Sequence, residues 1–335
     1  MKNQEKKTEN QLALFKLIKK NIPAHQSLAD KICDLLGTEA TDAAYRRIRG
    51  ETTISFDDAV MICKHFNISM DSIAGSTDKS QIQCSFAPAN INDVKSYLTF
   101  TQNLANMVDR LKSDPGSNIF LSAADIPVFH FLAYKELALF QFFSWNKNTC
   151  DYQLNYEAFV EELDTHELFK NYETIVEGYQ LIPSSEIWCA NTVDTTLRLL
   201  SYHSEMKHFN DKKIPLFICE HLLDLMDTLH KWMTKGVKGD TNTPFMFYES
   251  EIDVGNTFIL FKNKETTDCF VRLFTINGLE ISDELFCKEV EHWLYSLTQR
   301  STLIHKTSAK EGFNFVNDQK QKINAYRNSL KDKRI

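Results

Sequence analysis

The sequence predicts a mainly α-helical protein with an N-terminal bundle of short helices, a central helical region and a small C-terminal α+β unit that contains an antiparallel meander. Short apolar patterns with helical spacing and glycine stops occupy residues 1–76, and longer amphipathic segments occupy residues 92–240. Residues 241–335 contain β-branched and aromatic runs between turn signals. With 335 residues, of which 43% are hydrophobic, the chain is long enough for two or three domains, and we expect residues 77–91 to be a linker.

Two helices of the N-terminal bundle have clear start and stop signals. Ser27 precedes the apolar pattern of residues 28–36, and Gly37 follows it where a left-handed residue ends a helix. Ser55 and Asp58 have the spacing of a capping pair at the start of a later helix. These signals predict helices on both sides of a short middle segment.

The middle segment, residues 41–49, is short, rich in arginine and followed by Gly50. Ala44 and Ile48 lie four residues apart, with Tyr45 beside them, on the face that we expect to be buried. The side chains that we expect on the opposite face are Asp42, Ala43 and Arg46, with Arg47 and Arg49 at its flanks. An arginine cluster of this kind can also be a plain solvated helix face.

This region resembles the lambda-repressor-like (Cro/repressor) helix-turn-helix family over about residues 10–76. The residues that match the family pattern are Leu28, Ala29, Leu36, Gly37, Ala44, Ile48, Gly50 and Ile73. The turn after Gly37 is about one residue longer than the usual form. The resemblance implies a DNA-binding transcriptional regulator that reads bases through Asp42, Ala43 and Arg46. The run AYRRIRGE also resembles bacterial regulators of the Bacteroides type.

The residue types on this segment suit double-stranded DNA. Arg46 matches the two acceptors on a guanine edge, whereas Asp42 would either accept from cytosine or cap the helix N-terminus. The residues that we expect to contact phosphates are Lys31, Arg47, Arg49 and Thr52.

The charge distribution limits this prediction. Residues 1–73 contain eleven basic and ten acidic side chains, which gives them a net charge of +1. The rest of the chain has a net charge of −8, so the whole chain has a net charge of −7. A nearly neutral DNA-binding domain has modest affinity alone and gains from a second copy, so we expect a homodimer. The same weak charge keeps an alternative open, in which the chain is an adaptor whose N-terminal helices bind a protein partner.

A seven-residue repeat follows the expected linker. It is typical of a coiled-coil dimerisation helix, but an amphipathic helix packed on its own domain gives the same pattern over this length and is the stronger interpretation. The candidate dimerisation residues are Val94, Tyr97, Thr101, Leu104, Val108 and Leu111.

Three strands are predicted near the C-terminus, at Pro244–Tyr248, Thr257–Lys262 and Cys269–Ile276, followed by two helices. They read as an antiparallel meander. The resulting α+β unit could hold a small effector of unknown identity or simply complete the fold.

Several classes of function lack support. The eight cysteines have no CxxC spacing, His203 and His208 lie five apart rather than four, and no nucleotide-binding, nucleophile-turn or HExxH motif occurs. We therefore expect no enzyme activity, cofactor or metal. The N-terminus lacks the apolar core of a signal peptide, and the apolar run of residues 126–145 is interrupted by polar side chains, so we expect a cytoplasmic protein without membrane contact.

Overall fold

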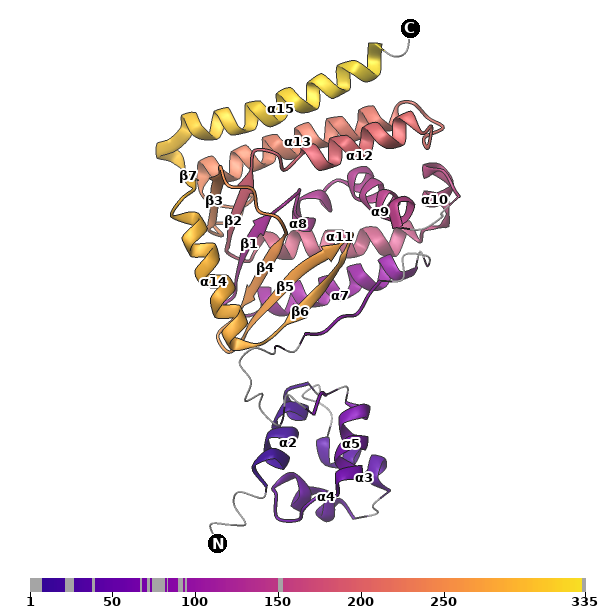
Figure 1. Ribbon diagram of the computed structural model, residues 1–335, viewed down its shortest axis with the longest axis vertical. Coiled ribbons are helices and arrows are strands. Elements are labelled where there is room, and N and C mark those ends of the chain that lie inside the picture. Colours follow the sequence, from indigo (N-terminus) through magenta and orange to yellow (C-terminus); the bar gives the residue numbers. More distant parts are fainter. Residues whose placement is uncertain are drawn as a thin grey trace. The chain divides into compact units, whose positions relative to one another are not determined.

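The computed structural model forms two units, Met1–Gln83 and Cys84–Ile335, which we call the head and the body (Figure 1). The residues that the structure describes are 8–21, 27–37, 40–66, 68–70, 73, 82, 84–89, 93, 95–149 and 153–332. Each unit has its own hydrophobic core.

The head is built from short helices. They are α2 (Glu9–Asn21), α3 (Leu28–Leu36), α4 (Thr41–Ile48) and α5 (Phe56–His65). Each contributes apolar side chains to one core, whose buried members are Leu14, Phe15, Ile18, Ala29, Ile32, Ala44, Ile62 and Cys63. The third helix is therefore anchored mainly through Ala44, with Ile48 packed beside it.

Local capping sets the ends of these helices as predicted. The Ser27 hydroxyl accepts a hydrogen bond from the Asp30 N–H at 3.3 Å, and Gly37 ends α3 with a φ of 61°. Ser55 and Asp58 form a reciprocal capping box at the start of α5. Because these interactions are local in sequence, they place the turns before and after α4.

The body is organised around a sheet. Its strands are β1 (Asn118–Ala123), β2 (Ser184–Cys189), β3 (Phe245–Ser250), β4 (Phe258–Lys262), β5 (Thr267–Phe274), β6 (Asn277–Ile281) and β7 (Thr302–Ile304). In the part of the chain that the structure describes, they form a seven-stranded sheet in the order β6-β5-β4-β1-β2-β3-β7. The pairs β1–β2 and β2–β3 are parallel, and the other pairs are antiparallel.

Helices cover both faces of this sheet. They are α7 (Lys95–Lys112), α8 (Val128–Phe131), α9 (Lys135–Thr149), α10 (Tyr156–Glu162), α11 (Thr165–Gln180), α12 (Asp194–Glu205), α13 (Ile214–Lys235), α14 (Glu284–Thr298), a 3-10 turn at Lys306–Ser308 and α15 (Ala309–Asp332). The side chains of Ile119 and Leu121 belong to a large core with α7, α9, α11 and α13, whereas Phe120 belongs to a smaller core with α14. Figure 1 shows α15 lying along α13.

The predicted fold needs correction within the body. Strands β1 and β2 lie in residues 92–240, which the sequence predicted as helical, and they join one sheet with the strands of residues 241–335. The three-stranded meander is also wrong in part, because β3 pairs with β2 and β7 rather than with β4. Antiparallel neighbours in sequence order are instead β4, β5 and β6.

Five of the six candidate dimerisation residues lie on α7, which packs against α11. Tyr97, Thr101 and Val108 are fully buried, Leu111 is 7% exposed, and Leu104 packs at the edge of the same core. Val94 lies outside the described residues. Because α11 of the same unit covers this stripe, the structure favours the amphipathic helix packed on its own domain over the coiled-coil dimerisation helix.

The end of the expected linker belongs to the body. Ser85 exchanges two backbone hydrogen bonds with Glu280 of β6, at 2.7 and 3.0 Å, and the Ala89 N–H donates to the Asn277 side chain at 2.7 Å. Residues 77–81 lie outside the described part of the chain. Among the described helices, none combines the length and the apolar character that crossing a membrane requires.

Candidate nucleic-acid interface

One face of α4 is exposed and carries polar side chains at helical spacing. Asp42, Tyr45, Arg46 and Arg49 are exposed, and their spacing of three, four and seven residues places them in one stripe. Ala44, on the opposite face, is fully buried. The helix therefore presents a defined row of exposed side chains, while its opposite face is anchored in the core of the head.

The side chain of Gln11 on α2 fixes the chain that leaves α4. Its amide nitrogen donates to the Arg47 carbonyl at 2.6 Å and to the Thr52 carbonyl at 2.8 Å, and its amide oxygen accepts from the Ile54 N–H at 3.1 Å. Gly50 turns this segment with a φ of 73°, and a Cβ there would meet the Leu12 side chain at 3.3 Å. Helix α4 and the loop after it are thus held to α2.

Two of the exposed arginines form ion pairs with nearby carboxylates. Arg46 Nε lies 3.1 Å from Asp42 Oδ2, across one helical turn, and both side chains are more than half exposed. Arg49 Nε lies 2.9 Å from Glu51 Oε1, and Arg49 Nη2 lies 3.4 Å from Glu51 Oε2. The exposed face of α4 is therefore nearly neutral, although it carries strong hydrogen-bonding groups.

The structure brings together most of the residues that the sequence singled out, with two differences. Ala43 is half buried, so it projects less than expected. The expectation that Tyr45 lies beside the buried face is wrong, because 48% of its surface is exposed and it takes the place of Ala43 in the stripe. The spacing of Tyr45 from Asp42 and Arg49 was a readable signal for this position. Asp42 lies inside the first turn of α4, and the residue before the helix is Ala40, so Asp42 is not the helix cap.

The expected phosphate contacts occupy less uniform environments. Arg49 and Thr52 are exposed, whereas Arg47 and Lys31 are half buried. The Nε atom of Arg47 is buried without a hydrogen-bond partner among the described residues. Arg47 therefore lies along the side of α4 rather than on its outward stripe.

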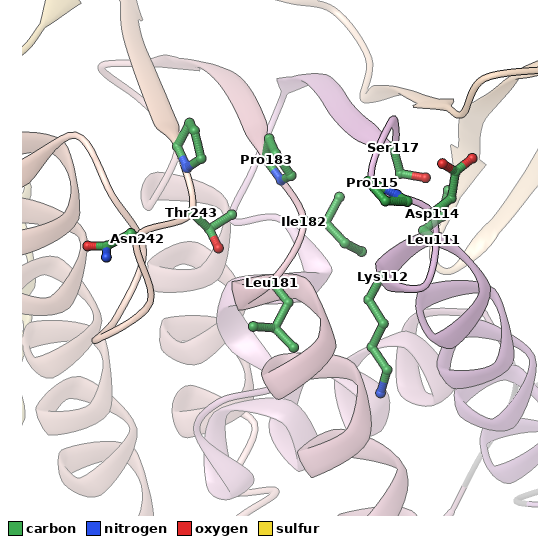
Figure 2. Close-up of a pocket in the computed structure, with 11 residues that line it drawn as sticks. Leu111, Lys112, Asp114, Pro115, Ser117, Leu181, Ile182, Pro183, Asn242 and Thr243 are labelled. Atoms are coloured by element: carbon green, nitrogen blue, oxygen red, sulfur yellow. The ribbon is translucent and has the colours of Figure 1, made fainter.

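The body contains a cavity of about 280 Å³ at the amino-terminal ends of the parallel strands (Figure 2). Ligands of open parallel sheets bind at the opposite, carboxyl ends. The acidic group in its wall, Asp114, accepts from the N–H groups of Gly116 and Lys264. These two hydrogen bonds lower the pKa of Asp114. The carboxylate thus ties two loops together, and we assign the cavity no ligand.

A buried polar cluster lies in the large core of the body. The Glu186 carboxylate is bonded by His130 at 2.9 Å, by the Trp188 indole N–H at 2.8 Å and by the Tyr179 hydroxyl. Burial raises the pKa of Glu186, but His130 and Tyr179 outweigh it and hold that pKa below its usual range. Lys238 donates to the carbonyls of Tyr179 and Ile182, at 2.9 and 2.6 Å. The groups of the cluster satisfy one another in the core, which favours a structural role.

No group of three or more metal-ligating side chains occurs among the described residues. Comparisons of the chain with protein-family models, with curated proteins and with solved structures found no match.

Proposed function

We propose that the chain is a sequence-specific DNA-binding transcriptional regulator of the lambda-repressor-like helix-turn-helix type, and that its body senses a signal or mediates assembly. The observation that carries this proposal is the exposed stripe of Asp42, Tyr45, Arg46 and Arg49 on α4. A short helix whose outward side chains are exposed and whose opposite face is anchored in the core has the form of an element that enters a major groove.

The roles within the interface follow from exposure. Arg46 and Asp42, near the middle and start of the stripe, are the base-reading candidates, and Tyr45 adds an aromatic surface for a thymine methyl group. Ala43 contributes at most a small apolar contact, because it is half buried. Arg49 and Thr52 contact phosphates beside the helix, with Arg47 and Lys31 at the margin.

A single head offers few phosphate contacts, so we also propose that the regulator binds DNA as a homodimer. About three neutralised phosphates per head correspond to a slope of about −3 for the logarithm of affinity against the logarithm of salt. Two heads on one site would double that slope. Because α7 is packed in its own unit, the dimer contact belongs to another surface of the chain.

The proposal is tested by replacing Arg46 with alanine in the full-length chain. Binding is measured by fluorescence anisotropy on a duplex that the wild-type chain selects from a random pool. We expect Arg46→Ala to cost about 1–3 kcal/mol on that duplex and to relax its preference over random duplex. Lys64, exposed on α5, is the matched control, because Lys64→Ala removes a positive charge away from the stripe. Equal losses in both variants would contradict base reading by α4.

The ion pairs on α4 favour one alternative. With Arg46 and Arg49 each beside a carboxylate, and with Phe56 73% exposed nearby in the sequence, the head could instead bind a protein as an adaptor. Titration of the full-length chain with random duplex at low and moderate salt separates the two functions. A regulator shows salt-dependent binding, whereas its absence at low salt would contradict the regulator and leave the adaptor.

A further inference from the structure

We propose that Asp42 is a positioning residue, which holds the Arg46 guanidinium in the orientation that reads a guanine, so that the two side chains act as one reading unit. This inference rests on the proposed DNA-binding function and specifies the base that α4 recognises.

The contact between the two side chains leaves the reading end of Arg46 available. In the described part of the chain, Asp42 pairs with Arg46 through Nε, at 3.1 Å. The two terminal nitrogens, Nη1 and Nη2, then form the outer edge of the guanidinium. Guanine presents two acceptors, O6 and N7, side by side in the major groove, and a forked pair of donors matches them. A carboxylate at Nε thus fixes the plane of the fork without occupying its outer edge.

Arg49 shows the contrast. Its carboxylate partner, Glu51, engages both Nε and Nη2, at 2.9 and 3.4 Å. Each terminal nitrogen carries two N–H groups, so this pair holds the Arg49 guanidinium at two points and still leaves its outer edge available. The difference in role therefore follows from position: Arg49 is the C-cap residue at the end of α4, where a phosphate contact fits, whereas Arg46 lies within the helix.

The position of Asp42 on α4 favours this arrangement. Asp42 lies in the first turn, where the helix dipole stabilises a negative charge, and it precedes Arg46 by four residues, an orientation that favours the ion pair. An exposed pair of this kind adds little to folding stability. The carboxylate of Asp42 instead weakens binding to DNA, since a negative charge on the reading face repels phosphates. Asp42 is thus expected to lower affinity for DNA in general and to raise discrimination.

The test measures discrimination separately from affinity. The probe is the duplex that the full-length wild-type chain selects from a random pool. Arg46→Ala identifies the guanine in it whose contact depends on Arg46. A second version of the duplex has 7-deazaguanine, which lacks N7, at that position. The full pair of contacts is worth roughly 5- to 150-fold in binding, and for the wild-type chain the replacement is expected to remove part of that, because O6 still accepts. In Asp42→Ala this penalty falls towards none, while affinity for random duplex rises. Asp42→Asn keeps an acceptor oxygen for Nε and restores part of the penalty.

Glu51→Ala is the matched control, since it removes the carboxylate from the other exposed arginine. It is expected to raise affinity for random duplex and to leave the 7-deazaguanine penalty unchanged. The inference is overturned if Asp42→Ala keeps the wild-type penalty, if Asp42→Ala and Glu51→Ala behave alike, or if the selected duplex lacks an Arg46-dependent guanine. In each of these outcomes the wild-type chain still binds DNA, so the proposed function stands. If the wild-type chain shows no salt-dependent binding to DNA, the proposed function fails as well. Thermal unfolding followed by circular dichroism shows whether the head of each variant is folded. If Asp42→Ala is unfolded, the comparison is made with Asp42→Asn instead.

Discussion

Two histidines in the body share a hydrogen bond that depends on their remaining neutral. His203 is fully buried, its Nδ1 lies 2.9 Å from Nδ1 of His208, and its Nε2 lies 3.1 Å from the Ser144 hydroxyl. One imidazole must donate and the other accept, so protonation of both removes the bond. Burial, followed by the charges of His208 and Lys147, lowers the pKa of His203 to about 4.

This residue predicts a loss of stability in mild acid. The unfolded chain takes up a proton at His203 below its ordinary pKa of 6.5, whereas the folded body does so only near 4. The free energy of unfolding therefore falls as the pH drops from 6.5 towards 4, by about 3 kcal/mol in total for this group. Urea unfolding followed by tryptophan fluorescence at several pH values measures it. His203→Gln flattens this dependence, while His292→Gln, at an exposed position on α14, keeps it. Parallel pH profiles for His203→Gln and the wild type would contradict the assignment.

Packing between whole elements decides what the seven-residue repeat means. Helix α7 approaches α11 closely at Gly178, where a Cβ would lie 2.3 Å from Val108 Cγ1. The heptad pattern marks a buried stripe, but it does not say which surface covers it. In this chain α11, about seventy residues further along, packs on the stripe. A local repeat cannot predict a partner that is so distant in the sequence.

Gly178→Ala tests the close approach of these two helices. In an open helix alanine is more stable than glycine by about 1 kcal/mol, but here overpacking costs about 1–3 kcal/mol, so we expect a net loss of stability. Chemical unfolding of the full-length chain measures it. Val108→Ala removes the atom that clashes, so the double variant should be more stable than the sum of the two single losses predicts. Additive losses would mean that Gly178 and Val108 do not meet.

Elements differ in how far they could be predicted. The caps at Ser27, Gly37 and Ser55 were predictable because the partners lie within a few residues of each other. Strands β1 and β2 were missed, because strands buried on both faces lack the alternation that marks a half-exposed strand, and nearly all of their residues are buried. On α4, spacing identified Asp42 and Arg46, but the ion pair that divides their roles required coordinates.

At the scale of the whole molecule, the head and the body have separate cores, and all four tryptophans, Trp145, Trp188, Trp232 and Trp293, belong to the body. Tryptophan fluorescence therefore reports the body, whereas DNA binding is proposed to report the head. The two units can thus be followed separately, the body by tryptophan fluorescence and the head by the proposed DNA binding.

Ile32→Ala uses these signals to test whether each unit is stabilised by its own core. Ile32 is fully buried in the head core, and its truncation leaves a cavity that costs about 2–5 kcal/mol. We expect a new low-temperature transition in circular dichroism and loss of DNA binding above it. The tryptophan transition should stay at the wild-type temperature, as it should in the control Leu12→Ala, whose side chain is 43% exposed. If the tryptophan transition instead moved with the head, the two cores would form one cooperative unit, and a signal received by the body could alter α4 through its stability alone.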